Sequence, residues 1–233
     1  MRVEDIKEYL KKWPRLYQLL IYLSRTIFLV GLGPKQALDC AFGDQALAGK
    51  QILNLGSGTG PLKQGIINVD IQPYPTVQVV ADASNLPFGD NSIDMIVSES
   101  LLEHVPYPEA VIAEIRRVLK PGGWLYISLP FVYPFHGSPN DYTRFTLEGL
   151  KARFHDFEVI RAGARSGPFT ALVIQTAYTA ALLFSFGSAI LYPMLLSLFL
   201  IILSPFKLFD LLFSLYPWAE EAASQIYFFA RKR

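Results

Sequence analysis

The chain has 233 residues, of which 52% are apolar and only 18% charged, and its formal net charge is +1. This composition excludes an intrinsically disordered chain, and the near-neutral charge predicts no nucleic-acid partner, because such proteins usually carry a basic excess. The single Cys40 excludes an intrachain disulfide and a cysteine-based metal centre. With only three histidines besides, the sequence predicts no metal site.

The first 48 residues are expected to form helices that cover either the globular core or a membrane surface. Residues 16–30 are mostly apolar but are interrupted by Arg25, so this run is too short and too charged for a confident membrane span. Aromatic and cationic side chains alternate before it. A helix lying on the membrane and a helix packed on the core both fit this pattern.

Residues 49–165 alternate short apolar runs with amphipathic segments. This alternation predicts an α/β fold with a doubly wound parallel sheet. Strands are expected at "QILNLG", "GIINVD", "VQVVAD", "SIDMIVS", "WLYISLP" and "FEVIRAG", helices at "PEAVIAEIRRVLK" and "LEGLKARF", and a seventh strand at "QIYFFARKR" near the C-terminus. Only "GTGPLKQG" and "IQPYPT" join the first three strands. The helices that usually follow the first two strands are therefore expected to be reduced or missing.

Glycines and carboxylates follow the first three predicted strands, at the edge where ligands bind in such sheets. The turn "GSGTG" at residues 56–60 lets the backbone approach a ligand closely. Asp70 ends the second strand, where a carboxylate can accept from both hydroxyls of a ribose, and Asp82 ends the third, where it can accept from an exocyclic amine. Together they predict an adenosine-shaped site, although each aspartate also fits a role in a turn or cap.

The segments "ILNLGSGTG", "INVDI", "VVADASNLPFGDNSIDMIVSESLLEHV" and "AEIRRVLKPGGWLYISLP" resemble the class I S-adenosylmethionine-dependent methyltransferases, in particular their type-11 branch, over about residues 51–130. The resemblance implies S-adenosyl-L-methionine as cofactor and a seven-stranded sheet in which strand 7 is antiparallel and lies between strands 5 and 6. The resemblance also implies which residues bind the cofactor. Gly56, Ser57, Gly58 and Gly60 would border the methionine part, Asp70 and Ile71 the ribose and adenine, Asp82 and Ala83 the adenine edge, and Ser98, Leu101 and His104 the sulfonium end.

The loop after the fifth strand, "FVYPFHGSPNDYTRFT", resembles a subset of these enzymes found with glycan and envelope biosynthesis. His136 and His104 are the candidate catalytic bases, because histidine is the usual base near neutral pH, and Asp141 is a candidate orienter or alternative base. Tyr142 and Arg144 are the candidate substrate-binding residues. Alternatively, Asp141 and Arg144 form a structural ion pair at the start of the following helix, and His104 only shapes the pocket.

Residues 166–206 contain no Asp, Glu, Lys or Arg, and residues 166–221 as a whole separate the sixth strand from the seventh. We predict a membrane-associated helical insert, which crosses the bilayer twice or is re-entrant, since both flanking strands belong to one sheet. The amphipathic stretch at its end, around Lys207 and Asp210, suits the headgroup region. Arginine and lysine residues on both sides favour a cytoplasmic catalytic domain. A buried helical pair in a soluble core is the alternative.

These observations predict a membrane-associated methyltransferase that acts on an oxygen of a lipid-linked or amphipathic acceptor, such as an envelope glycan, a lipid or a quinone. Its expected partners are therefore this small or lipid-linked acceptor and membrane lipid, and the oligomeric state is left open. A catalytically inactive, membrane-tethered scaffold with the same fold is the alternative. A nicotinamide-dependent oxidoreductase fits poorly, because the G-x-G-x-x-G pattern is missing.

Overall fold

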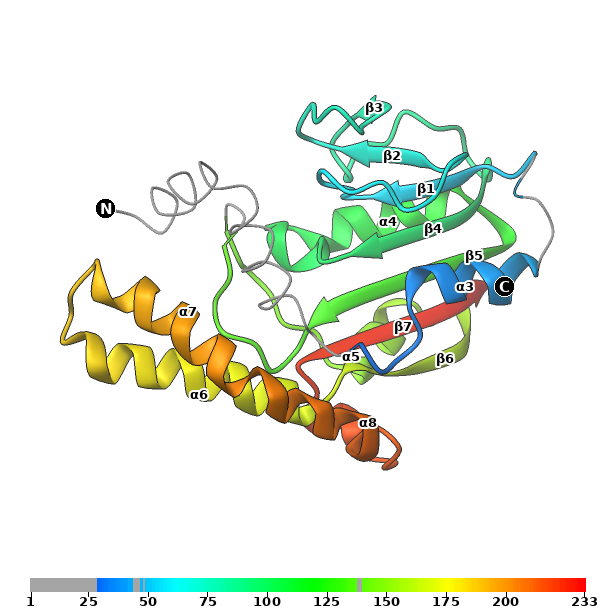
Figure 1. Ribbon diagram of the computed structural model, residues 1–233. Helices are drawn as coiled ribbons and strands as arrows, with labels where there is room; N and C mark the ends of the chain where they lie inside the picture. Colours follow the sequence, from blue (N-terminus) through cyan, green and yellow to red (C-terminus); the bar gives the residue numbers. More distant parts are fainter. Residues whose placement is uncertain (1–28, 44–46, 48, 138–139) are drawn as a thin grey trace. The chain divides into compact units, whose positions relative to one another are not determined.

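Figure 1 shows a computed structural model of the chain, which describes residues 29–43, 47, 49–137 and 140–233. The chain divides into two compact units. The sheet unit comprises the described residues of 31–131, 135–165 and 225–233, and the helical unit comprises residues 29–30, 132–134 and 166–224. The helices expected within residues 1–28 lie outside the described residues. Residues 31–43, expected to form part of a separate N-terminal segment, belong to the sheet unit.

The sheet unit contains one seven-stranded sheet with the strand order β3-β2-β1-β4-β5-β7-β6. Pairing is parallel from β3 to β5, whereas β7 pairs antiparallel with β5, so both the seventh strand and its expected place between the fifth and sixth are confirmed. The strands are β1 (Ile52–Leu55), β2 (Ile67–Asp70), β3 (Val79–Val80), β4 (Ile93–Glu99), β5 (Leu119–Pro130), β6 (Phe157–Ser166) and β7 (Gln225–Lys232).

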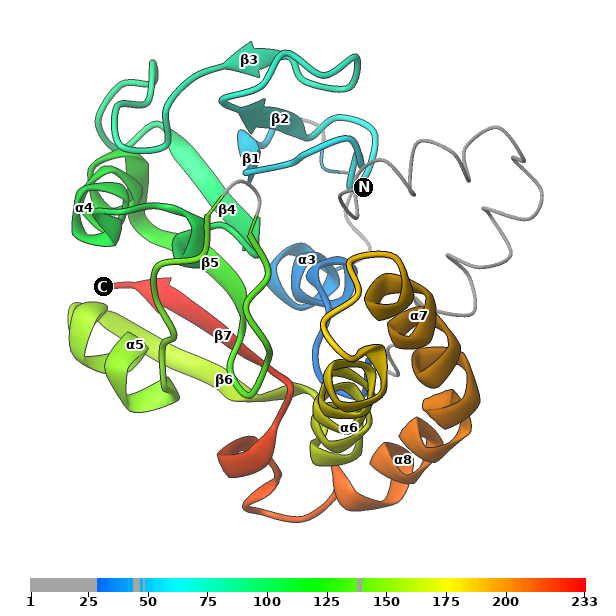
Figure 2. The same cartoon turned by 90° about the vertical axis from the view of Figure 1, so that its left-hand side faces the viewer.

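Helices cover both faces of this sheet, which explains why β1 is buried along its whole length. Figure 2 shows α4 (Pro108–Val118) and α5 (Leu147–Arg153) on one face and α3 (Pro34–Phe42) on the other. On the α3 face, Ala37 and Leu38 share one apolar cluster with Met95, Val97 and Tyr126 of the central strands. The amphipathic spacing predicted for α4 is confirmed, since Val111, Ile112, Ile115 and Val118 are all buried.

The connections between the first three strands contain no helix, as their short length predicts. Two strands differ from their predicted extent. β3 is only two residues long, and β5 begins at Leu119 rather than at Trp124. The "PGG" turn after α4 is included in β5, where Gly122 takes a φ of 75° and the pairing of β4 with β5 shifts register between Ile93 and Met95.

The helical unit is built on a hairpin of two apolar helices, α6 (Pro168–Ser185) and α7 (Leu191–Leu203), which lie side by side (Figures 1 and 2). The chain continues through η2 (Ser204–Phe209), α8 (Asp210–Phe213) and η3 (Ala219–Ala222) before it returns to β7. Two stretches are long and apolar enough to cross a bilayer: Pro168–Ser185, with a mean hydropathy of 1.3, and Leu191–Phe213, with 2.1. Most of the second stretch is exposed, unlike a buried core helix.

The two charged residues of η2 and α8 do not face outward, as the predicted headgroup-facing helix would require. Lys207 and Asp210 are both buried. Asp210 accepts hydrogen bonds from the backbone N–H groups of Phe169 (2.8 Å) and Thr170 (2.9 Å) and from the Thr170 hydroxyl (2.6 Å). It thereby caps the first turn of α6 from the other arm of the hairpin, because those N–H groups have no partner within the helix.

Candidate functional site

The carboxyl ends of β1, β2 and β4 meet at one edge of the sheet. Leu55 pairs with Val69 on one side and with Ser98 on the other, so the turn at residues 56–60 begins beside Asp70 and the end of β4. Gly56 and Gly58 have φ angles of 73° and 55°, a region that favours glycine. A Cβ on Gly56 would lie 3.0 Å from a methyl carbon of Leu101, whereas a Cβ on Gly58 would meet no atom within 4 Å. The turn therefore packs against Leu101 at Gly56 and has open space beside it at Gly58.

Asp70 holds this turn in place. Its Oδ2 accepts a hydrogen bond from the Gly58 N–H (2.8 Å) and its Oδ1 accepts one from the Gln72 N–H (2.9 Å). Ile71 is 62% exposed, so the residue expected against an adenine ring leaves an apolar surface uncovered. A carboxylate has about four acceptor positions, which leaves capacity for ligand hydroxyls.

Asp82 lies at the end of the neighbouring connection after β3. Its Oδ1 accepts from both the N–H (2.8 Å) and the hydroxyl (2.7 Å) of Ser84, an arrangement in which the side chain shapes its own turn. Ala83 is buried beside it. Asp82 therefore has the turn role that the sequence left open, and both of these hydrogen bonds go to Oδ1.

Two buried hydroxyls at this edge have no hydrogen-bond partner among the described residues: Ser57 Oγ and Ser98 Oγ. Buried polar atoms are usually paired, so each marks a place where a ligand group or water is needed. Both belong to the residues that the resemblance assigns to S-adenosylmethionine. An open glycine turn, a carboxylate with spare acceptor capacity and two orphaned hydroxyls fit that cofactor.

The two histidines proposed as bases lie together, although 32 positions separate them in sequence. The rings of His104, in η1 (Leu102–His104), and His136 pack edge to face with centroids 4.8 Å apart. His104 Nδ1 lies 2.6 Å from the carbonyl oxygen of Asn140. Between them lies Glu103, whose Oε1 is 3.7 Å from His104 Nε2 and 3.8 Å from His136 Nε2.

The loop that carries His136 is fixed by an ion pair. Asp141 is hydrogen-bonded to both terminal nitrogens of Arg144 and accepts from the backbone N–H of His136 (2.9 Å). The bonded Arg144 guanidinium lowers the pKa of the Asp141 carboxyl to about 2. Asp141 is thus an acceptor that positions the His136 backbone and not a ready base. The helix α5 is capped by Thr146 instead, which accepts from the Gly149 N–H.

Tyr142 is half exposed, and its hydroxyl accepts a hydrogen bond from the Asn140 side chain (2.9 Å). Its backbone N–H donates to the carbonyl of Glu103 (2.7 Å), which ties the loop directly to η1. Tyr142 is therefore the more accessible of the two candidate substrate-binding side chains.

Glu103 is the residue that reasoning from sequence missed. Its neighbour His104 stood out because histidines are few, but a glutamate in "LLEHV" gives no sign that it is buried or that His136 comes to it from another loop. Ser100, with a φ of 54°, is a second missed feature. A non-glycine residue with positive φ at the end of β4 is typical of strained, functional edges.

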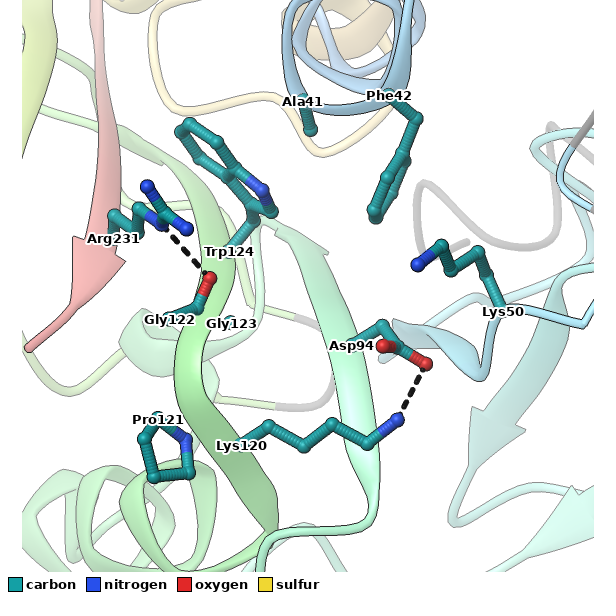
Figure 3. Close-up of a pocket in the computed structure, with 10 residues that line it drawn as sticks. All are labelled: Ala41, Phe42, Lys50, Asp94, Lys120, Pro121, Gly122, Gly123, Trp124 and Arg231. Carbon is teal, nitrogen blue, oxygen red and sulfur yellow. Dashed lines mark hydrogen bonds and ion pairs between the residues drawn. The ribbon is translucent and has the colours of Figure 1, made fainter. Parts of the chain in front are cut away.

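A separate cavity of about 350 Å³ lies near the amino ends of the strands, lined in part by Lys50, Asp94, Lys120, Trp124 and Arg231 (Figure 3). Its polar groups largely satisfy one another, since Lys120 pairs with Asp94 (2.9 Å) and Arg231 donates to the Gly122 carbonyl (3.0 Å). Ligands of doubly wound sheets bind at the carboxyl ends, so this cavity is not the cofactor site.

Comparisons with known proteins agree with this geometry. A family model described as a methyltransferase domain matches residues 53–127. A demethylmenaquinone methyltransferase of Renibacterium salmoninarum is 30% identical over 125 residues, which cover 46% of this chain and 52% of the relative. A demethylmenaquinone methyltransferase of Paenarthrobacter aurescens is 32% identical over 122 residues, covering 45% and 48%. The chain spans about half the length of these curated relatives.

Among solved structures, a Haemonchus contortus phosphoethanolamine N-methyltransferase 2 in complex with S-adenosyl-L-methionine has a TM-score of 0.50 at 20% identity, over 91% of this chain and 56% of that one. At this identity the likeness concerns the fold alone. The glycine turn, the two aspartates and the strand order are those that the type-11 resemblance implies. The sheet unit therefore has the fold, and residues 53–127 the sequence, of a class I S-adenosylmethionine-dependent methyltransferase domain.

Proposed function

We propose that this protein is a membrane-associated S-adenosylmethionine-dependent methyltransferase that methylates an oxygen of a lipid-linked or amphipathic acceptor. One observation carries the enzymatic part. The glycine turn, Asp70 and the orphaned hydroxyls of Ser57 and Ser98 meet at the carboxyl edge of the sheet, where a nucleoside cofactor is expected.

The roles of the chain in this reaction are binding and orientation. When bound, S-adenosylmethionine supplies a methyl group on a sulfonium, which is electrophilic without further activation. Asp70 would hold the ribose hydroxyls, and the turn at residues 56–60 would follow the methionine part. Much of the rate then comes from holding the acceptor oxygen in line with the methyl carbon. Without a bound metal ion, His104 and His136 would be the candidate basic groups for the acceptor hydroxyl.

The apolar hairpin supports a membrane-bound acceptor. It is inserted between β6 and β7, and β7 begins at Gln225, which pairs with Pro130 at the carboxyl end of β5. The insert is thus attached at the edge of the sheet that carries the proposed site. Large apolar side chains along it are exposed, among them Leu182, Leu183 and Ile202. Exposed apolar surface of this extent is typical of a membrane or partner surface.

Two of the relatives are named for demethylmenaquinone, a membrane-soluble quinone, and this supports an amphipathic acceptor but not the choice of oxygen as the methylated atom. A quinone in its reduced, hydroquinone form, a polyprenyl-linked sugar and a lipid headgroup share the chemistry that this proposal requires: a hydroxyl oxygen on an amphipathic molecule, which can exchange its proton for the methyl group. Extraction of labelled product separates these acceptors from water-soluble ones.

The test is methyl transfer from radiolabelled S-adenosylmethionine to a total lipid extract by the purified full-length chain in detergent. We expect label in the organic phase, and a loss of labelling in Asp70→Ala. Label only in the aqueous phase would contradict the acceptor class. Tight S-adenosylmethionine binding without transfer to any fraction would instead favour the inactive scaffold.

A further inference from the structure

The three side chains Glu103, His104 and His136 form a cluster whose ligand atoms all lie within 4.8 Å of one another. At its centre is the Glu103 carboxylate, which is 1% exposed. Within the described part of the chain, neither of its oxygens accepts a hydrogen bond. An ionised carboxylate removed from water is costly unless it is paired, hydrogen-bonded or bound to a metal. A positively charged group is therefore needed next to the Glu103 carboxylate.

The tautomer of His104 limits what that positive group is. A carbonyl oxygen only accepts, so His104 Nδ1, at 2.6 Å from the Asn140 oxygen, must carry a proton. In the neutral ring this leaves Nε2 with a lone pair, on the side that faces Glu103. A lone pair aimed at an anionic oxygen is repulsive. A cation between the two atoms turns this contact into an attraction.

The distances favour a metal ion over a proton. A protonated Nε2 would approach the carboxylate to about 2.8 Å in a charge-assisted hydrogen bond. Instead, the two Nε2 atoms stop at 3.7 and 3.8 Å from Glu103 Oε1. Ligands that are each about 2.0–2.1 Å from one zinc ion lie roughly 3.3 Å apart at a tetrahedral angle. The two contacts with Glu103 therefore need to close by only a few tenths of an ångström, and the remaining pair of ligand atoms, which lies within 4.8 Å, by at most about 1.5 Å.

We propose that Glu103, His104 and His136 bind a divalent transition-metal ion, with zinc favoured by the donor set. Two imidazole nitrogens and one carboxylate are a recurrent set of protein ligands for catalytic zinc, which keeps a further position open for water or substrate. The bond from His104 Nδ1 to a backbone carbonyl is the usual outer contact of a metal-binding imidazole. The expectation of no metal site rested on the number of histidines, and the fold brings two of the three together.

This inference deepens the proposed function, and its consequence for the reaction rests on that function. With an ion bound, both Nε2 atoms act as ligands and are not available as bases. A hydroxyl coordinated at the open position would instead lose its proton to solvent water more readily, as metal-bound water does. The acceptor class that fits is a hydroxyl compound able to coordinate through its reacting oxygen.

The test measures zinc binding by the full-length chain, produced without a histidine tag, stripped with a chelator and dialysed against zinc. We expect one zinc per chain by elemental analysis. Cobalt in its place should give a visible absorption band of the intensity typical of four or five ligands. His136→Ala and Glu103→Gln should each weaken binding at least about tenfold. His136 is one-third exposed, so its replacement leaves a foldable chain even if Glu103→Gln does not fold.

His155→Ala is the matched control, because it removes the one histidine outside the cluster from an exposed position and should leave binding unchanged. Wild type that takes up no stoichiometric zinc or cobalt would overturn the inference. So would equal loss of binding in His155→Ala and His136→Ala. S-adenosylmethionine binding, measured on the same sample, separates the two proposals. If S-adenosylmethionine binds but zinc does not, only the proposed metal site is wrong. If zinc binds but S-adenosylmethionine does not, the proposed methyltransferase function is wrong.

Discussion

Asp70 has two tasks at the residue scale. Its two oxygens accept from the N–H groups of Gly58 and Gln72, which fixes the glycine turn at the end of β1. Its remaining acceptor capacity faces the edge where ribose hydroxyls are expected. In the proposed function, the same charge would shape the loop before the cofactor arrives and hold the cofactor afterwards, so little reordering would be required on binding.

Replacing Asp70 by Asn should weaken S-adenosylmethionine binding at least about tenfold, because hydrogen bonds to a charged acceptor contribute roughly 1.5–3 kcal/mol. The measurement is the rise in unfolding temperature with cofactor concentration. Asp90→Asn is the control, since Asp90 is an exposed carboxylate paired with Arg117 away from this edge. Equal cofactor stabilisation of wild type and Asp70→Asn would contradict the assigned role.

The Asp141–Arg144 pair predicts a pH dependence of stability. Arg144 lowers the pKa of Asp141 to about 2, below the ordinary 3.8, so the ionised form is favoured in the folded state. The pair therefore stabilises the fold fully above pH 3.8, and this contribution is lost as the pH falls toward 2. It amounts to about 2 kcal/mol, since one pKa unit corresponds to about 1.4 kcal/mol.

Urea unfolding of wild type and Asp141→Asn between pH 2 and pH 6 tests this. The difference in free energy of unfolding should be largest at pH 5–6 and should shrink below pH 3.8. A difference that stays constant over this range would show that the ion pair does not contribute in this way.

At the scale of elements, the hairpin depends on one buried carboxylate. Asp210 of α8 accepts three hydrogen bonds from the first turn of α6, and it approaches so closely that a Cβ on Gly167 would lie 2.4 Å from its Oδ1. The glycine before α6 is thus required by the contact and not only by the turn. This long-range cap links the two ends of the insert.

Asp210→Ala should destabilise the helical unit by about 3 kcal/mol, because it leaves buried donors without a partner next to the buried Lys207. Limited proteolysis in detergent should then cut within residues 186–224 faster than in wild type. Glu221→Gln, at an exposed position in the same unit, is the control. Unchanged cleavage in Asp210→Ala would contradict the capping role.

The helices and strands were largely predictable from the sequence, whereas the burial of individual charged residues was not. Apolar runs, the glycine turn and the carboxylates after β2 and β3 are local signals. They located the sheet correctly, and they predict the edge at which the cofactor binds. The length of the connectors predicted the missing helices, because the eleven residues of 56–66 and the eight residues of 71–78 are at or below the minimum for a crossover helix with its loops. Burial of Asp210 and Glu103 was not predicted, since Asp210 contacts the start of α6 and Glu103 contacts the loop that carries His136 and Tyr142, both distant in sequence.

At the scale of the whole molecule, the chain consists of two regions that differ in amino-acid composition. The charged residues lie outside residues 166–206, and the excess hydrophobicity belongs mainly to the insert. α6 has 18 residues and so extends about 27 Å, close to the hydrocarbon thickness of about 30 Å. A membrane-associated hairpin and a sheet unit in the cytoplasm follow as expectations from this division.

Flotation with liposomes tests the membrane expectation. Wild type should float with the vesicles, and the triple replacement of Leu182, Leu183 and Ile202 by Lys should remain in the dense fraction. A charge costs about 2.5–3.5 kcal/mol at the centre of a span, where Ile202 lies in Leu191–Phe213, and less near the end of a span, where Leu182 and Leu183 lie in Pro168–Ser185. Lysine at Val159 and Ile160, exposed apolar residues of β6, is the control and should not change flotation. Flotation of the triple variant equal to wild type would contradict membrane insertion of the hairpin.

The most direct test of the account is isothermal titration of the folded wild-type chain with S-adenosylmethionine. The glycine turn, Asp70 and the two orphaned hydroxyls predict saturable binding of one cofactor per chain, with weaker binding of adenosine alone because the contacts to the methionine part are missing. A folded chain that gives no saturable heat with S-adenosylmethionine would contradict the central claim.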